Sequence, residues 1–244
     1  MTNTISRRNL FGIAAAGLVT IAGVESAEAQ LTSRPRAVAR RGFKKYPNGY
    51  FYGKDGKFNV ETAKNVIIEF LKYHGYPIFP DLRERLWISD YGLGHFTEVG
   101  LSCVGFVNNL QGEYSYMLQD LFMLPHQMLP EHWHVKPEDT VKNGAQKNEA
   151  WIVRWGRSYI IGEGEANLPA EVVVPKSHGG VTVNHCTVAD PGMTVKLSSL
   201  GSHHWQFAGS EGVILSEVAN YHDNGSVRHQ NETANKDFLG GLNG

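Results

Sequence analysis

Three histidines and one carboxylate carry the clearest chemical signal in this sequence. His132 and His134 are separated by one residue, Glu138 follows four positions later, and His204 lies in a distant part of the chain. On a β-strand the side chains at i and i+2 project from the same face, so the first two imidazoles would point into one space. Three nitrogens and one oxygen suit a first-row divalent ion such as Mn, Fe, Co, Ni or Zn. The sequence therefore predicts a metal site inside a β-barrel.

Two of these four assignments required a choice between neighbouring residues. Asp139 follows Glu138 directly, and Pro137 disturbs the strand there, so either carboxylate could turn inward. We choose Glu138, because its side chain reaches further than that of Asp139 and because its spacing from the histidines fits a metal-binding motif better. His203 and His204 would point to opposite faces of a strand, so only one can be a ligand. The spacing of three positions from Gly201 selects His204.

The elements that must position these residues are mostly short strands. Apolar runs bounded by turn residues predict strands at 99–107, 114–123, 150–161, 171–174, 181–188, 193–197 and 213–218. One helix is predicted at 59–74, with Asn59 as its cap and Gly75 after its end. Residues after Asn220 are rich in Asn, Gly and His and predict a long loop. Many short strands without alternating helices indicate a sandwich, a jelly roll or a small barrel.

Two segments resemble a known family. Residues 129–144, LPEHWHVKPEDTVKNG, are similar to the metal-binding segment of the bacterial D-lyxose isomerase family, and residues 216–224, SEVANYHDN, resemble that family's Glu-Val-x-x-x-Asn-Asp segment. The resemblance spans roughly residues 96–238. It implies an all-β cupin fold, a double-stranded β-helix or jelly-roll barrel, to which the sequence adds one N-terminal flanking helix.

The same resemblance implies a manganese-type aldose–ketose isomerase that acts on a small free sugar. The expected cofactor is Mn(II), with Fe(II), Co(II) or Zn(II) as alternatives. Glu217 is the candidate general base. Asp223, His222 and His126 are candidates for binding sugar hydroxyls. Cupins of this kind are commonly dimers, so a homodimer is consistent with the resemblance.

This chain departs from the family pattern in two places, and other functions therefore stay open. The family carries a Glu-Lys pair on the strand before the metal motif, where this sequence offers Gln119 and Asp120 and no lysine. The family also has four residues between the second histidine and the glutamate, whereas this chain has three. One alternative is a cupin dioxygenase with Fe(II). Another is a non-catalytic, metal-dependent sugar-binding module.

The N-terminus predicts export. Arg7 and Arg8 precede a short apolar stretch, and Ala27-Glu-Ala29 offers a cleavage site, as in a twin-arginine signal peptide over residues 1–29. A basic leader at 30–57 and a single cupin domain at 58–244 would follow. We therefore expect passage through the twin-arginine translocase to the periplasm or the exterior, without a stable membrane anchor.

Charge and cysteine content narrow the remaining classes. The formal net charge is −1, which argues against a general nucleic-acid binder. Cys103 and Cys186 are the only two cysteines. In an exported protein they could form a disulfide, but both lie in apolar runs where buried thiols are equally expected.

Overall fold

The structure is a computed structural model that describes residues 42–109, 115–137 and 145–240. The predicted signal peptide at 1–29, the first part of the leader and the predicted ligand Glu138 lie outside these ranges. The described residues belong to one compact unit that begins at Gly42. No helix within them is long and apolar enough to span a membrane.

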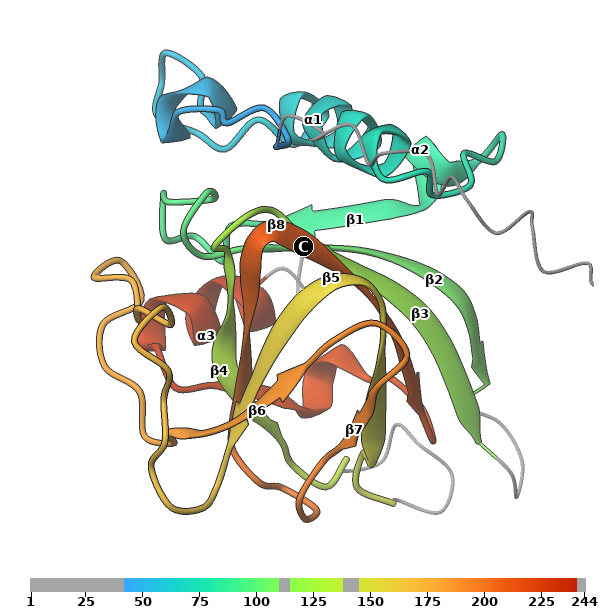
Figure 1. Cartoon of the computed structure of the whole chain (residues 1–244), viewed down its shortest axis with the longest axis vertical. Coiled ribbons are helices and arrows are strands. Elements are labelled where there is room, and N and C mark those ends of the chain that lie inside the picture. Colours follow the sequence, from blue (N-terminus) through green and yellow to red (C-terminus); the bar gives the residue numbers. More distant parts are fainter. Residues whose placement is uncertain (1–41, 110–114, 138–144, 241–244) are drawn as a thin grey trace, which may run out of the picture. The chain divides into compact units, whose positions relative to one another are not determined.

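A strongly curled antiparallel sheet forms the centre of this unit (Figure 1). Its strands are β1 Leu86–Ser89, β2 Leu101–Asn109, β3 Tyr116–Met123, β4 Met128–His134, β5 Glu149–Gly162, β6 His185–Ala189, β7 Thr194–Lys196, β8 His204–Ala219 and β9 Val227–His229. The main path runs β1-β2-β3-β8-β4-β9, and β5 pairs with β6, β7 and β8. The predicted all-β, cupin-like barrel is confirmed.

Strand β8 is the central element of the sheet, because it pairs with β3, β4 and β5. It extends well beyond the predicted strand at 213–218 and carries His204 at its start and Glu217 near its end. The strand bends between these residues, where Gly212 has a φ of 81° and faces Gly156 of β5, whose φ is 77°. One strand thus supplies side chains to the barrel interior from both of its ends.

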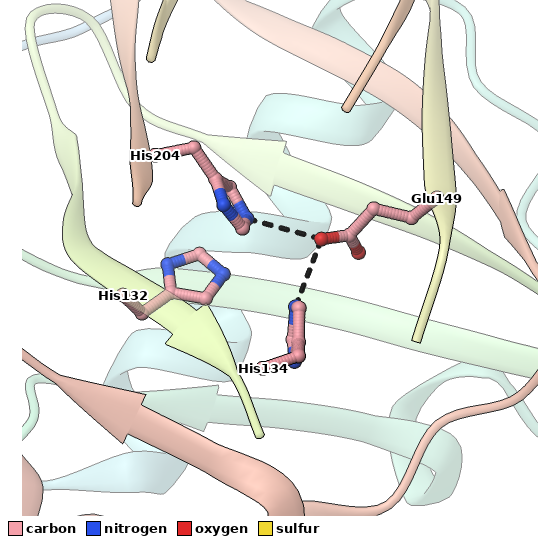
Figure 2. Close-up of side chains that lie close together, drawn as sticks. All are labelled: His132, His134, Glu149 and His204. Carbon is pink, nitrogen blue, oxygen red and sulfur yellow. Dashed lines mark hydrogen bonds and ion pairs between the residues drawn. The ribbon is translucent and has the colours of Figure 1, made fainter. Parts of the chain in front are cut away.

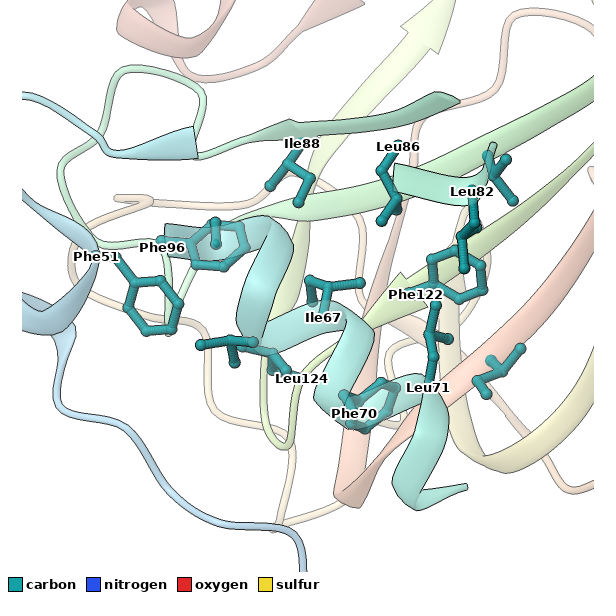
Figure 3. Close-up of a cluster of buried hydrophobic side chains, with 14 residues drawn as sticks. Phe51, Ile67, Phe70, Leu71, Leu82, Leu86, Ile88, Phe96, Phe122 and Leu124 are labelled. Atoms are coloured by element: carbon teal, nitrogen blue, oxygen red, sulfur yellow. The ribbon is translucent and has the colours of Figure 1, made fainter. Parts of the chain in front are cut away.

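The predicted helix is confirmed as α1, Val60–Tyr73, which covers one face of the sheet (Figure 1). The Asn59 side chain accepts a hydrogen bond from the backbone N–H of Thr62, as its sequence position predicted. The apolar stripe of α1, which includes Ile67 and Phe70, packs against sheet residues such as Phe122 (Figure 3). A single turn, α2 Leu82–Arg85, then leads into β1.

The solvated leader predicted for residues 30–57 does not extend to residue 57. Asn48–Phe51 form a 3-10 turn, η1, and Phe51 is fully buried in the cluster beneath α1. The Tyr52 hydroxyl donates a hydrogen bond of 2.7 Å to Asp90. The aromatic residues that alternate with the basic ones explain the difference, because their apolar rings are stabilised by burial.

Two other expectations from sequence were wrong. Residues 171–174 form no strand; the N–H of Val172 instead bonds back to the carbonyl of Pro169 in a turn. The segment after Asn220 is not a loose loop, since it forms the turn η2 Asn224–Ser226, strand β9 and helix α3 Glu232–Gly240. Strand β9 completes the sheet beside β4.

Candidate metal centre

Four buried side chains converge inside the barrel (Figure 2). His132 and His134 come from the end of β4, Glu149 from the start of β5, and His204 from the start of β8. One ligand atom from each residue lies within 4.8 Å of the others. The strand pairing explains part of this, because His132 stands directly opposite His204 in the β4–β8 register.

The three histidines predicted from sequence are therefore brought together, and the carboxylate beside them is that of Glu149. The predicted ligand Glu138 lies outside the described residues. Sequence reasoning missed Glu149 because it assumed a short spacing after His134. A signal was present, since Glu149 directly precedes the apolar strand at 150–161, where an unpaired carboxylate is rare.

Backbone carbonyls fix the tautomers of two imidazoles. His132 Nδ1 donates to the carbonyl of Pro130 at 2.8 Å, and His204 Nδ1 donates to that of Ser202 at 3.0 Å. Each bond leaves the Nε2 lone pair without a proton. This is the usual arrangement of metal-ligating histidines, in which the second nitrogen is held by a carbonyl or carboxylate.

The Glu149 carboxylate lies close to two imidazole nitrogens of the cluster. Its Oε1 is 2.8 Å from His134 Nε2 and 3.0 Å from His204 Nε2. His204 Nε2 has no hydrogen-bond partner among the described residues, although it is buried. An unprotonated nitrogen and a carboxylate oxygen repel each other at this distance unless a proton or a metal ion lies between them. The donor set therefore fits a divalent metal.

A buried lysine joins this cluster to the predicted base. Lys147 Nζ lies 2.6 Å from Glu149 Oε2 and 2.6 Å from Glu217 Oε1. Glu217 Oε2 accepts a 3.1 Å hydrogen bond from Gln119 on β3. All three charged side chains are almost completely buried. Lys147, from the segment before β5, thus contacts the same carboxylate as Gln119.

Burial and charge separate the pKa values of these groups. Burial opposes the charge of Lys147, but the two carboxylates raise its pKa above the ordinary value. Burial favours neutral Glu149, yet Lys147 and His134 hold its pKa well below the usual range. Burial raises the pKa of Glu217, which Lys147 only partly opposes. The same environment thus holds Glu149 in its charged form and makes Glu217 the more readily protonated of the two carboxylates.

Burial also keeps the imidazoles of His132 and His134 neutral. It lowers the pKa of His134 to about 4 and holds that of His132 well below its ordinary value. Neutral imidazoles are the form that binds metal, so these histidines do not have to release a proton when they coordinate an ion.

The remaining predicted site residues have different positions. His222 lines the cavity next to Lys147, and its Nε2 is 2.5 Å from Asn224 Oδ1. Asp223 does not line the cavity; its carboxylate accepts from the N–H of Gly225 at 3.2 Å and caps η2. Asp223 therefore stabilises the turn η2 next to His222, which lines the cavity.

The structure does not bring His126 to the metal centre. His126 lies in the turn before β4, whereas the ligands lie at the opposite end of that strand. At about 3.3 Å per residue, the strand separates them by roughly 20 Å. His126 instead lines a separate pocket with Lys44 and Pro125.

His203 points away from the cluster, as the alternation along the strand predicted. Its Nδ1 is 2.8 Å from Oε1 of the buried Glu131, and its ring stacks on Trp133 with centroids 4.1 Å apart. Cys103 and Cys186 are both free thiols, and Cys103 lines the cavity.

A cavity of about 230 Å³ opens onto the cluster. One end is formed by His132, His134, Lys147 and Glu217, and the other by the rings of Trp87, Tyr91 and Phe238. That volume is many times the roughly 10–15 Å³ that one water molecule requires, so the cavity accepts a small ligand.

Comparison with known proteins finds D-lyxose isomerases among the similar sequences. The chain is 31% identical over 158 residues to the D-lyxose ketol-isomerase of Cohnella laeviribosi, covering 64% of this chain and 82% of that one. It is 32% identical over 173 residues to the D-lyxose/D-mannose isomerase of Thermosediminibacter oceani, covering 70% and 90%.

Solved structures support the fold. The L-ribose isomerase of Acinetobacter sp. DL28, solved with L-ribose, superposes with a TM-score of 0.55 at 13% identity, covering 78% of this chain and 97% of that one. At that identity the likeness concerns the fold alone. The family model described as D-lyxose isomerase matches residues 85–236, more than half of the sequence. The chain belongs to the D-lyxose isomerase family.

Proposed function

We propose that this protein is a metal-dependent aldose–ketose isomerase that acts on a small free sugar of the D-lyxose or D-mannose kind, with Mn(II) as its first-choice ion. The observation that carries this proposal is the buried chain of contacts from Glu149 through Lys147 to Glu217. It connects the carboxylate of the metal cluster to Glu217, which lines the cavity together with Lys147.

Interconversion of an aldose and a ketose moves one hydrogen between neighbouring carbons and one between their oxygens. A divalent ion held by His132, His134, Glu149 and His204 would supply Lewis-acid polarisation of the sugar oxygens. Glu217 would remove the proton from the carbon next to the carbonyl and return it to the other carbon. Its raised pKa suits both directions of this transfer.

Lys147 would hold Glu217 in position and balance its charge. Its ammonium has two carboxylate partners and is almost fully buried. A proton removed by Glu217 leaves negative charge on the substrate, and a fixed cation nearby stabilises that charge in a water-poor cavity. Gln119 holds the second Glu217 oxygen, so the carboxylate cannot rotate freely.

The two alternative functions explain less of the site. A cupin dioxygenase with Fe(II) or a non-catalytic sugar-binding module would use the metal ligands, but neither requires a second carboxylate with a buried lysine. The Lys147–Glu217 pair costs desolvation energy, and buried charges of this kind mark functional sites.

The test is proton exchange at carbon. Protein loaded with Mn(II) is incubated with D-lyxose or D-mannose in D2O, and deuterium in both sugars is followed by NMR. We expect ketose formation and deuterium at the carbon next to the carbonyl, both abolished in Glu217→Gln. Glu211→Gln, at an exposed position of the same strand, is the matched control. Oxygen uptake with Fe(II) in place of exchange would overturn the proposal.

We also propose that the protein is exported in folded form by the twin-arginine pathway. The support is the sequence at Arg7-Arg8 and the apolar stretch that follows. Changing both arginines to lysine should retain the protein in the cytoplasm, as measured by cell fractionation. The same change at Arg40 and Arg41 is the control. Unaltered export of the Arg7-Arg8 variant would contradict the proposal.

A further inference from the structure

A fourth imidazole lies beside the metal cluster without belonging to it. His229 stands opposite His132 in the β4–β9 pairing, and the centroids of their rings are 5.8 Å apart. Its side chain lines the cavity, yet the residue is only 5% exposed. Its Nδ1 is buried and has no hydrogen-bond partner within residues 42–109, 115–137 and 145–240. Buried polar atoms are seldom left unpaired, so this nitrogen is available to bond a ligand in the cavity.

Aromatic rings surround His229 on the side away from the cluster. The Phe238 ring of α3 lies 4.9 Å from it and the Tyr91 ring 5.1 Å, measured between centroids. Tyr91 and Phe238 are themselves nearly parallel at 6.3 Å. Trp87 of β1 packs edge-on against Phe238 and is 39% exposed, so it lies at the mouth of this region. We name Trp87, Tyr91, His229 and Phe238 the distal subsite.

The backbone at Tyr91 is strained, as is common at ligand sites. Tyr91 has a φ of 55°, in the left-handed region that bulky residues seldom adopt, although its side chain is only 2% exposed. Its N–H bonds to Ser89 Oγ at 2.9 Å. Strain of this kind persists where surrounding contacts enforce it, and it clusters at ligand sites.

The distal subsite differs chemically from the metal end of the cavity. Within the described residues, Lys147 is the only cationic side chain that lines the cavity, and two carboxylates already bind it. The distal subsite thus offers the ring faces of Trp87, Tyr91 and Phe238 and an imidazole whose Nδ1 is unpaired. Ring faces suit the C–H groups of a sugar, and the imidazole suits a single hydroxyl. A phosphate or carboxylate at that end would lack a cation.

We propose that the distal subsite binds the uncharged end of the open sugar chain, with His229 bonding its terminal hydroxyl, and that His229 thereby selects the substrate. This inference rests on the proposed isomerase function, which places the carbonyl end of the sugar at the metal cluster. His229 is a substrate-binding residue that takes no part in proton transfer.

The test compares His229→Phe, which keeps an aromatic ring but cannot form the hydrogen bond, with the unchanged protein. The substrates are D-mannose and 6-deoxy-D-mannose, which lacks only the terminal hydroxyl. We expect kcat/KM for D-mannose to fall at least tenfold and that for the deoxy sugar to change less than threefold. A site built to bond a hydroxyl loses most when that pairing is removed. His95→Phe, half-exposed and outside the cavity lining, is the control.

Two further measurements separate the possible failures. Metal content should be equal in both proteins, and loss of metal from His229→Phe would make His229 a ligand and overturn the proposal. Equal losses on both sugars would overturn the subsite while leaving the isomerase function intact.

Binding of the non-reacting polyol D-mannitol, measured by calorimetry, tests the subsite without turnover. If the unchanged protein isomerises no sugar but binds D-mannitol more tightly than His229→Phe, the proposed function fails and the subsite stands. If the polyol binds neither protein and no sugar is converted, both proposals fail.

Discussion

Substitution of single glutamates by glutamine can identify the carboxylate that binds the metal. Glu149 Oε1 lies between two imidazole nitrogens, so Glu149→Gln replaces a charged oxygen donor by a neutral amide. We expect metal affinity to fall at least tenfold and isomerase activity to fall with it. Metal content after dialysis against a weak chelator is the measurement.

Glu138→Gln is the matched control, because Glu138 was the ligand that the sequence spacing suggested. It should retain its metal. Retention of metal by Glu149→Gln and loss from Glu138→Gln would contradict the assignment.

Lys147 should matter for stability as well as for catalysis. Lys147→Met leaves Glu149 and Glu217 buried without their shared cation, and breaking a buried ion pair in this way costs about 3–5 kcal/mol. The free energy of unfolding from denaturant titration measures this loss. Lys147→Met/Glu217→Gln should be more stable than Lys147→Met, because one of the uncompensated charges is gone. A double variant that loses the sum of the two single effects would argue against coupling.

These residues show where prediction from sequence ends. His132 and His134 could be predicted as a pair, because the alternation along a strand is a local property. The placement of Lys147 and Glu149 near this pair could not, since thirteen and fifteen positions separate them from His134 and the pairing of β5 with β8 brings them back. The sequence marked Glu149 only as an unusual carboxylate beside an apolar strand. His229 was missed for the same reason, because it faces His132 only through the β4–β9 pairing.

At the scale of elements, the bend in β8 depends on glycine. A Cβ on Gly212 would lie 2.6 Å from Phe70 of α1 and 2.8 Å from the carbonyl of Met123, and the residue has a positive φ. Gly212→Ala should therefore destabilise the fold by about 2–5 kcal/mol, from left-handed strain and crowding of the core. Gly105→Ala on β2, where no atom lies within 4 Å of the new Cβ, is the control. Equal free energies of unfolding for the two variants would refute this account.

Elements with a strong local pattern were the predictable ones. Helix α1 has an apolar stripe and a capping Asn59, so its bounds could be predicted closely. Strand β9 has only three residues, and α3 has a weak apolar face, so neither has a recognisable local pattern. Both form because β4 offers a free edge and because Phe238 packs near Tyr91. Such elements are determined by tertiary contacts.

For the whole molecule, metal binding and folding should be linked. The ligands come from β4, β5 and β8, which are far apart in the sequence, so the unfolded chain cannot present the site. Binding to the native state alone stabilises it by about 2.7 kcal/mol at a metal concentration of 100 Kd. For a domain of this size, that corresponds to a melting temperature higher by roughly 5–10 °C.

Differential scanning calorimetry with Mn(II) and then with excess EDTA measures the shift, and His204→Ala provides the reference. That variant loses a ligand but retains the strand pairing, so EDTA should leave its melting temperature unchanged. If EDTA lowers the melting temperatures of both proteins equally, the metal stabilises the fold from a site other than the His204 cluster. If it lowers neither, no bound metal ion stabilises the fold, and the assignment of His132, His134, Glu149 and His204 as its ligands is wrong.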